Sequence, residues 1–90
     1  MILIRKCEVC FVPRFDGGWW ADGLRPSFNI DGELVLCFVH SGGPEKMKPG
    51  VPHMVSIELP YYVPDNLREG QTFKLQDASR VIATGVVVEV

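Results

Sequence analysis

Short apolar runs separated by glycine and proline predict a chain built from β-strands. A first long run covers residues 2–12, and a nearly continuous apolar run covers Glu33–His40; valine, isoleucine and aromatic residues dominate both. Apolar and polar residues alternate with period two in Met54–Leu59 and again in Thr72–Leu75, which is typical of a half-buried strand. Val81–Val90 then predicts a closing strand.

The residues between these runs predict turns. Pro26 holds Arg25 in an extended conformation. Phe28–Ile30 is expected to begin a short strand that returns at Asp31-Gly32, because both of these residues tolerate a positive φ. Pro and Gly in Lys48-Pro49-Gly50 favour a further turn. These signals and the absence of any helical pattern predict a closed antiparallel barrel or a small sandwich.

Composition narrows the class of protein. The 90 residues suffice for one small domain, residues 1–90. Gly85, inside the last apolar run, predicts a β-bulge. With a net charge of −2, the chain has no overall positive field to attract the phosphates of nucleic acid, so this function is not favoured. The sequence contains no apolar run near the roughly 20 residues of a membrane span. Arg5-Lys6 interrupts the apolar start, which is not typical of a signal peptide, so we expect a cytoplasmic protein with reduced cysteines.

Several segments resemble, in order, the C-terminal (third) β-barrel domain of elongation factor Tu. They are Asp16-Gly17-Gly18, Gly23-Leu24-Arg25-Pro26-Ser27-Phe28, Met47-Lys48-Pro49-Gly50, Phe73-Lys74-Leu75 and Arg80–Val87. The resemblance implies an all-β fold, a six-stranded antiparallel closed β-barrel. It also implies a domain that has no catalytic residues of its own, packs on neighbouring domains and helps to hold the T-stem of aminoacyl-tRNA.

The chain departs from that family in ways that bear on function. It contains no G-x-x-x-x-G-K-[ST] segment, so we expect no GTP binding or hydrolysis, and the resemblance implies a stand-alone relative lacking the GTPase domain. Ser27 replaces the family's Gln after Arg-Pro. The segment from Gln76 to Arg80 stands where the family approaches the tRNA backbone, which makes Asp77 and Arg80 the candidate nucleic-acid contacts.

Aromatic and basic residues in loops are the candidate partner-binding residues: Trp19, Trp20, Arg25, Tyr61 and Tyr62. Two adjacent indoles in a polar loop cannot both be buried in so small a core, and exposed aromatics are enriched at binding hot spots. Alternatively, one indole plugs an end of the barrel and the other covers Arg25 or Pro26. Arg25 either forms an ion pair with Asp16 or Asp22 or faces a partner, and the tyrosines suit either an interface or a lid.

Cysteine and histidine spacing suggests a metal site that strand geometry disfavours. Cys7-x-x-Cys10 and Cys37-x-x-His40 together imitate a Cys3His zinc set. On a strand, residues i and i+3 point to opposite faces, so neither pair is expected to chelate a metal. His40 and His53 have no sequence neighbours that predict a catalytic triad. We expect no enzyme activity, cofactor or metal.

The sequence therefore favours a non-catalytic binding module related to elongation factor Tu. Its expected partner is a protein in a translation context, and tRNA is the less favoured partner. The alternative is a stand-alone regulatory or immunity-like protein that binds one protein partner. The pattern leaves the oligomeric state open.

Overall fold

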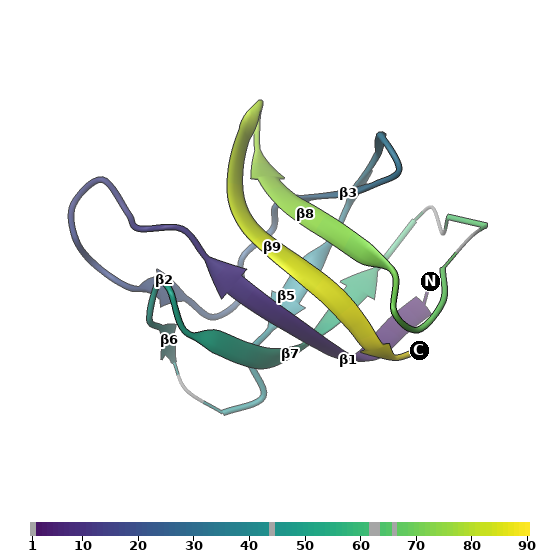
Figure 1. The fold of residues 1–90 in the computed structure, drawn as a ribbon, viewed down its shortest axis with the longest axis horizontal. Helices are drawn as coiled ribbons and strands as arrows, with labels where there is room; N and C mark the ends of the chain where they lie inside the picture. Colours follow the sequence, from purple (N-terminus) through teal and green to yellow (C-terminus); the bar gives the residue numbers. More distant parts are fainter. Residues whose placement is uncertain (1, 44, 62–63, 66) are drawn as a thin grey trace.

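The fold consists of β-strands connected by turns and loops (Figure 1). The computed structural model describes residues 2–43, 45–61, 64–65 and 67–90. The strands are β1 (Ile2–Phe11), β2 (Trp20–Ala21), β3 (Ser27–Ile30), β4 (Glu33–Leu36), β5 (Phe38–His40), β6 (Lys46–Met47), β7 (Pro52–Leu59), β8 (Thr72–Asp77) and β9 (Arg80–Glu89). The described residues contain no helix, so the prediction of an all-β protein is confirmed. Within that part of the chain no helix is long and apolar enough to cross a membrane.

Seven strands form one curled sheet, and two form a short ribbon. The sheet has the order β4-β3-β8-β9-β1-β7-β5 and curls into a half-barrel, while β2 pairs with β6 at one end of it (Figure 1). Every described pairing is antiparallel. The prediction of a closed six-stranded barrel was wrong, because the sheet has seven strands and its outermost strands, β4 and β5, are not paired with each other.

The open arrangement originates at Cys37, which divides the run Glu33–His40 that the sequence predicts as one strand. β4 before it pairs with β3, whereas β5 after it pairs with β7. The backbone N–H of Cys37 donates to the carbonyl of Pro26 (3.1 Å), and that of Val39 donates to Leu24 (2.8 Å). The segment Gly23–Pro26 therefore lies along the outer edge of β5 and satisfies backbone groups that would otherwise be free.

One face of each long strand supplies the core. The interior contains Ile4, Cys7, Val9, Phe11, Phe28, Ile30, Val35, Cys37, Val39, Met47, Val55, Ile57, Leu59, Phe73, Leu75, Ile82, Ala83 and Val87. The buried residues of β7 are Val55, Ile57 and Leu59, as the alternation of Met54–Leu59 predicts. Burial of apolar area at about 25 cal/mol per Å² makes this inner face the main source of stability.

Gly85 is required by packing and is not a bulge. It pairs in regular register with Val9 on one side and Phe73 on the other, so the bulge prediction was wrong. A Cβ atom there would lie 2.9 Å from the carbonyl oxygen of Glu8 and closer still to the Phe73 ring. The ring of Phe73 lies over Gly85 and stacks on Phe28 with 4.7 Å between ring centroids. Glycine here gives an inward-facing aromatic residue its space.

Candidate functional site

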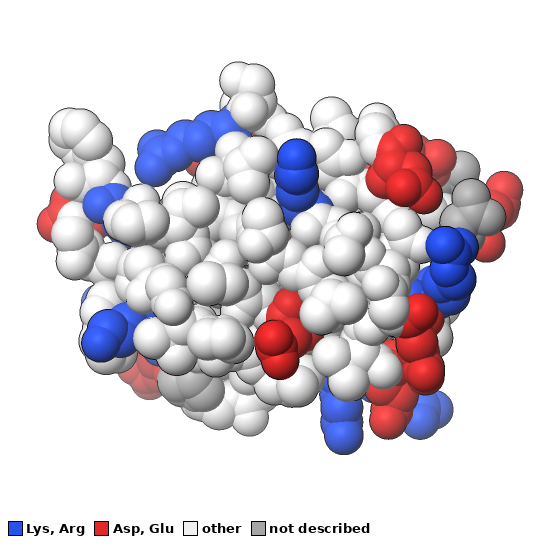
Figure 2. Space-filling model, viewed as in Figure 1, with Lys and Arg blue, Asp and Glu red and all other residues white. Residues whose placement is uncertain are grey.

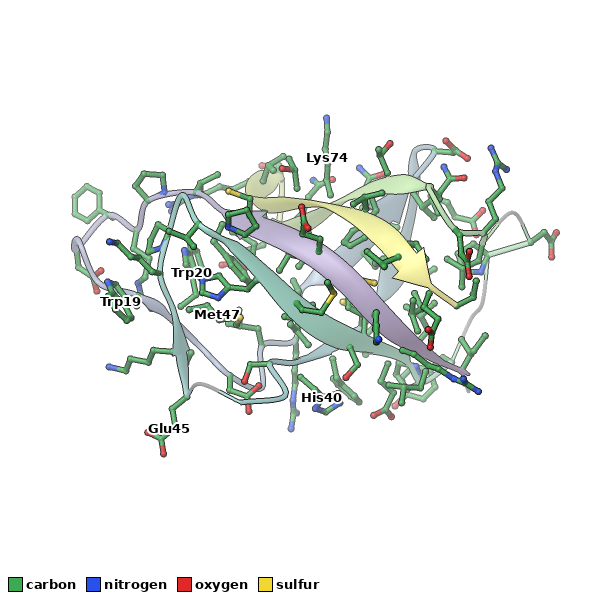
Figure 3. The ribbon with its side chains drawn as sticks, turned by 60° about the horizontal axis from the view of Figure 1, so that its bottom comes forward. Trp19, Trp20, His40, Glu45, Met47 and Lys74 are labelled. Atoms are coloured by element: carbon green, nitrogen blue, oxygen red, sulfur yellow. The ribbon has the colours of Figure 1, made fainter. Side chains whose placement is uncertain are left out.

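A loop with two exposed aromatic side chains protrudes beyond the end of β1. This segment, residues 13–19, is called the aromatic loop below, and it forms the outermost bend at the left of Figure 1. Phe15 is 100% exposed and Trp19 is 50% exposed. Figure 3 shows Trp19 directed away from the ribbon. Large aromatic side chains exposed to solvent are enriched at interaction surfaces, which makes this loop the candidate site.

The aromatic loop is held by a compact polar turn. Arg14 donates two hydrogen bonds to Asp16, from Nε to Oδ1 and from Nη2 to Oδ2, each 3.1 Å long. Asp16 Oδ1 also accepts the backbone N–H of Gly18 at 2.8 Å, and Gly17 donates to the carbonyl of Arg14. The Gly18 bond first, and then the Arg14 side chain, lower the pKa of Asp16. The turn thus fixes the backbone on both sides of Phe15, which reduces the ordering cost of binding.

Trp20, next to Trp19 in the chain, packs into the end of the half-barrel. Its Nε1 donates to the carbonyl of Val12 at 2.7 Å. Its ring stacks on Phe11 at 5.5 Å between centroids, and the Arg14 guanidinium lies 5.4 Å from the ring centroid. Trp20 pairs with Met47 across the β2–β6 ribbon and lies beside it in Figure 3. These contacts show that Trp20 holds the base of the loop, with its polar N–H satisfied.

Arg25 makes a different contact from the expected ion pair. Its guanidinium lies over the Phe38 ring, 5.2 Å from the centroid. Asp16 pairs with Arg14, and Asp22 accepts the backbone N–H of Ser41 at 2.7 Å. This backbone bond is the main reason why the pKa of Asp22 is lowered. Among the described residues no ion pair includes Arg25, so the ion-pair alternative is wrong and the alternative that Arg25 faces a partner stays a prediction.

The remaining predicted site residues lie at two ends of the sheet. Leu59, at the end of β7, pairs with Ile2 at the start of β1, which places the neighbouring Tyr61 at the end opposite the aromatic loop. Tyr61 is 78% exposed, and Tyr62 lies outside the described residues.

The candidate nucleic-acid contacts lie at the same end as the aromatic loop. Phe11 pairs with Ala83, so the β8–β9 turn lies beside the end of β1. Asp77 and Arg80 pair with each other across that turn, and both are exposed. The structure thus places Arg80 and the aromatic loop at one end of the β1–β9 pairing and Tyr61 at the other.

Two features of this surface do not follow from the sequence patterns above. One is Phe15 itself; its position between Pro13-Arg14 and an Asp-Gly-Gly turn was the available signal. The other is an open groove of about 700 Å³ on the outer surface of β1, β9, β8 and the β3–β4 turn. Glu8, Asp31 and Lys74 line this groove, and none of them belongs to an ion pair between described residues. The groove depends on pairing between distant strands, which no local pattern shows.

Two of the cysteines are buried in the core, and His40 lies at the surface. Cys7 and Cys37 are buried, and burial raises the pKa of each thiol to about 12, with a further contribution from Cys7 at Cys37. The Cys37 thiol donates to the carbonyl of Pro26 at 3.4 Å. Within the described part of the chain, no three His, Cys, Asp or Glu side chains are grouped to hold a metal ion. His40 lies on the surface beside Glu58, with 3.3 Å between Nε2 and Oε1.

No protein-family model matches this chain, and no curated protein matches it either. The resemblance to the third domain of elongation factor Tu therefore stays a prediction.

Proposed function

We propose that this chain is a non-catalytic protein-binding module whose contact surface is the aromatic loop. The observation that carries the proposal is the complete exposure of Phe15 beside the half-exposed Trp19. Four other aromatic rings pack in two pairs, Phe11 on Trp20 and Phe28 on Phe73. An aromatic side chain left wholly in water contributes nothing to the core, whereas at an interface it supplies a large apolar contact area.

The construction of the loop supports the same function. Arg14 and Asp16 fix the turn below Phe15, and Trp20 anchors its base against Phe11. The side chains that hold the loop are thus distinct from the side chains that it presents. A preorganised aromatic pair loses little conformational entropy on binding, which favours a partner with an apolar pocket.

We further propose, from the resemblance to elongation factor Tu, that the partner belongs to translation. A protein partner is favoured over tRNA because the net charge of −2 provides no general attraction to a phosphate backbone. Arg80 lies at the same end of the sheet and is the residue through which tRNA would be contacted. Regulation of, or immunity against, a single non-ribosomal protein is the alternative role.

Site-specific photocrosslinking in the source cell tests the proposal. A photoreactive phenylalanine at position 15 is expected to give a discrete crosslinked protein, identified by mass spectrometry. The matched control carries the same group at Tyr61, an exposed aromatic residue at the opposite end of the sheet. Recovery of a translation factor or ribosomal protein supports the translation context, and one unrelated protein supports the regulatory alternative. No adduct at position 15, or the same adducts from both positions, would overturn the loop as the contact surface.

Direct binding to the identified partner then measures the contribution of each ring. Phe15→Ala and Trp19→Ala are each expected to weaken binding about 30-fold or more, the range of hot-spot side chains. Arg80→Ala is expected to leave binding to a protein partner within about twofold. If tRNA is the partner, the same substitution weakens binding and reduces its dependence on salt.

A further inference from the structure

The outer surfaces of neighbouring strands differ sharply in polarity. The outward side chains of β8 are Thr72, Lys74 and Gln76. The outward side chains at the end of the adjacent β9 are Val86, Val88 and Glu89; Val88 is exposed, and Val86 is half-buried. The end of β9 therefore presents apolar area to solvent between the polar Thr84 and Glu89, whereas the outer surface of β8 is polar throughout.

Exposed apolar side chains also lie across β1 and β7, where they alternate with the charged Arg5, Lys6, Glu8 and Glu58. Three adjacent strands of the sheet, in the order β9-β1-β7, contribute to what we call the β7–β1–β9 face. Its large apolar side chains that reach solvent are Leu3, Met54, Val86, Val88 and Val90. Much of the area over these strands in Figure 2 carries no charged side chain.

The charges on the central strand of this face have a self-complementary order. Lys6 and Glu8 are exposed on β1, which lies between β9 and β7. Neither belongs to an ion pair between described residues; Arg5, by contrast, pairs with Glu89 at 3.7 Å. A cation and an anion two residues apart on one strand are complementary to the same strand running in the opposite direction.

We propose that the β7–β1–β9 face is the interface of a homodimer with twofold symmetry. The axis lies in the interface and crosses β1 at right angles near Cys7, so that the two β1 strands run antiparallel across it. Lys6 then faces the partner's Glu8, and Glu8 faces the partner's Lys6. An axis parallel to β1 would instead place Glu8 against the partner's Glu8, which like charges oppose.

The same axis also matches the apolar side chains of β9. Val86 is paired with Glu8, and Val88 lies beside the register shift at Lys6. Glu89 pairs with Lys6, so reversing the strand direction sets Val88 and Glu89 against the partner's Val86, and apolar contact is made beside the paired charges. Because the aromatic loop follows β1, antiparallel β1 strands place the two loops of the dimer at opposite ends, both free for binding.

Sedimentation equilibrium of the purified chain tests the proposal. A reversible dimer is expected, and a wild-type chain that stays monomeric into the high micromolar range overturns the proposal. Lys6→Glu and Glu8→Lys are each expected to weaken dimerisation about tenfold or more, because each sets like charges against each other. Lys74→Glu makes the same change of charge on the outer surface of β8 and is expected to leave dimerisation unchanged.

Charge exchange distinguishes this interface from any other. The double variant Lys6→Glu/Glu8→Lys restores opposite charges and is expected to recover dimerisation to within about threefold of wild type. Mixing the two single variants is expected to yield a heterodimer, detected by native mass spectrometry, in preference to either homodimer. A dimer whose affinity ignores these exchanges uses another surface and refutes the proposed axis. Circular dichroism confirms that each variant is folded.

Discussion

The aromatic loop and the β2–β6 ribbon at its base are adjacent in the chain but differ in what their tryptophans do. Trp19 directs its ring to solvent, whereas Trp20 stacks on Phe11 and donates a hydrogen bond to the carbonyl of Val12. Trp20 begins β2, and its pairing with Met47 turns its side chain into the end of the half-barrel. The start of β2 at Trp20, with Trp19 left in the loop, thus gives two identical neighbours different surroundings.

This difference separates stability from binding. Removal of a side chain from the base of the loop takes away packing and a satisfied hydrogen bond. Removal of the Phe15 side chain from the tip takes away only surface that water already contacts. Substitutions on the two sides of the Trp19–Trp20 peptide bond should therefore have effects of different kinds.

The largest expected effect is at Trp20. Trp20→Ala removes the stack on Phe11, the bond to Val12 and the contact with Arg14, and is expected to lower the free energy of unfolding by about 3 kcal/mol. Urea denaturation followed by circular dichroism measures the change. Trp20→Phe keeps a ring but loses the N–H donor, so about 1 kcal/mol is expected. If both variants were as stable as the wild-type chain, the ring of Trp20 would not anchor the loop.

An intermediate effect is expected from the buried thiols of the core. The pKa of Cys7 and of Cys37 is raised from 9.0 to about 12, so the folded chain favours the neutral thiols. Their contribution to stability is complete below pH 9 and is lost as the pH rises from about 9 to about 12, because the unfolded chain ionises first. Urea denaturation across this range measures the loss.

Thiol labelling checks the same point at neutral pH. A thiol reagent is expected to modify the half-buried Cys10 in the native chain, and Cys7 and Cys37 only after unfolding. Cys10→Ser is the control, since it should abolish the native reaction and leave the alkaline loss of stability unchanged. Rapid native labelling of Cys37 would show that the interior is open to solvent.

The smallest effect on stability is expected at the tip of the loop. Phe15→Ala is expected to change the free energy of unfolding by no more than about 0.5 kcal/mol, because its ring faces water; Trp19→Ala, at a half-exposed residue, is expected to cost less than Trp20→Ala. The same urea denaturation experiment measures this change. A loss comparable to that of Trp20→Ala would show that the tip packs against the fold and would contradict its role as a presented surface.

Local signals in the sequence determined the strands and several turns. The alternation of Met54–Leu59 corresponds to the buried face of β7, and Asp31 and Gly32 both adopt the positive φ that the hairpin signal predicts, 50° and 81°. Gly50 likewise has a positive φ of 78° in the expected turn. These features depend on residues within a few positions of each other, so a single sequence contains them.

Contacts between distant segments were decided only by the tertiary structure. The pairing of Gly23–Pro26 with the edge of β5 divides a run that reads as one strand, and the Phe73 ring gives Gly85 a role that its neighbours in the chain do not reveal. Whether Trp19 or Trp20 is packed depends on contacts with Phe11 and Met47, which are not their neighbours in the sequence. Alternation states that a strand has two faces, but only the surrounding strands determine which face is covered and what each exposed side chain meets.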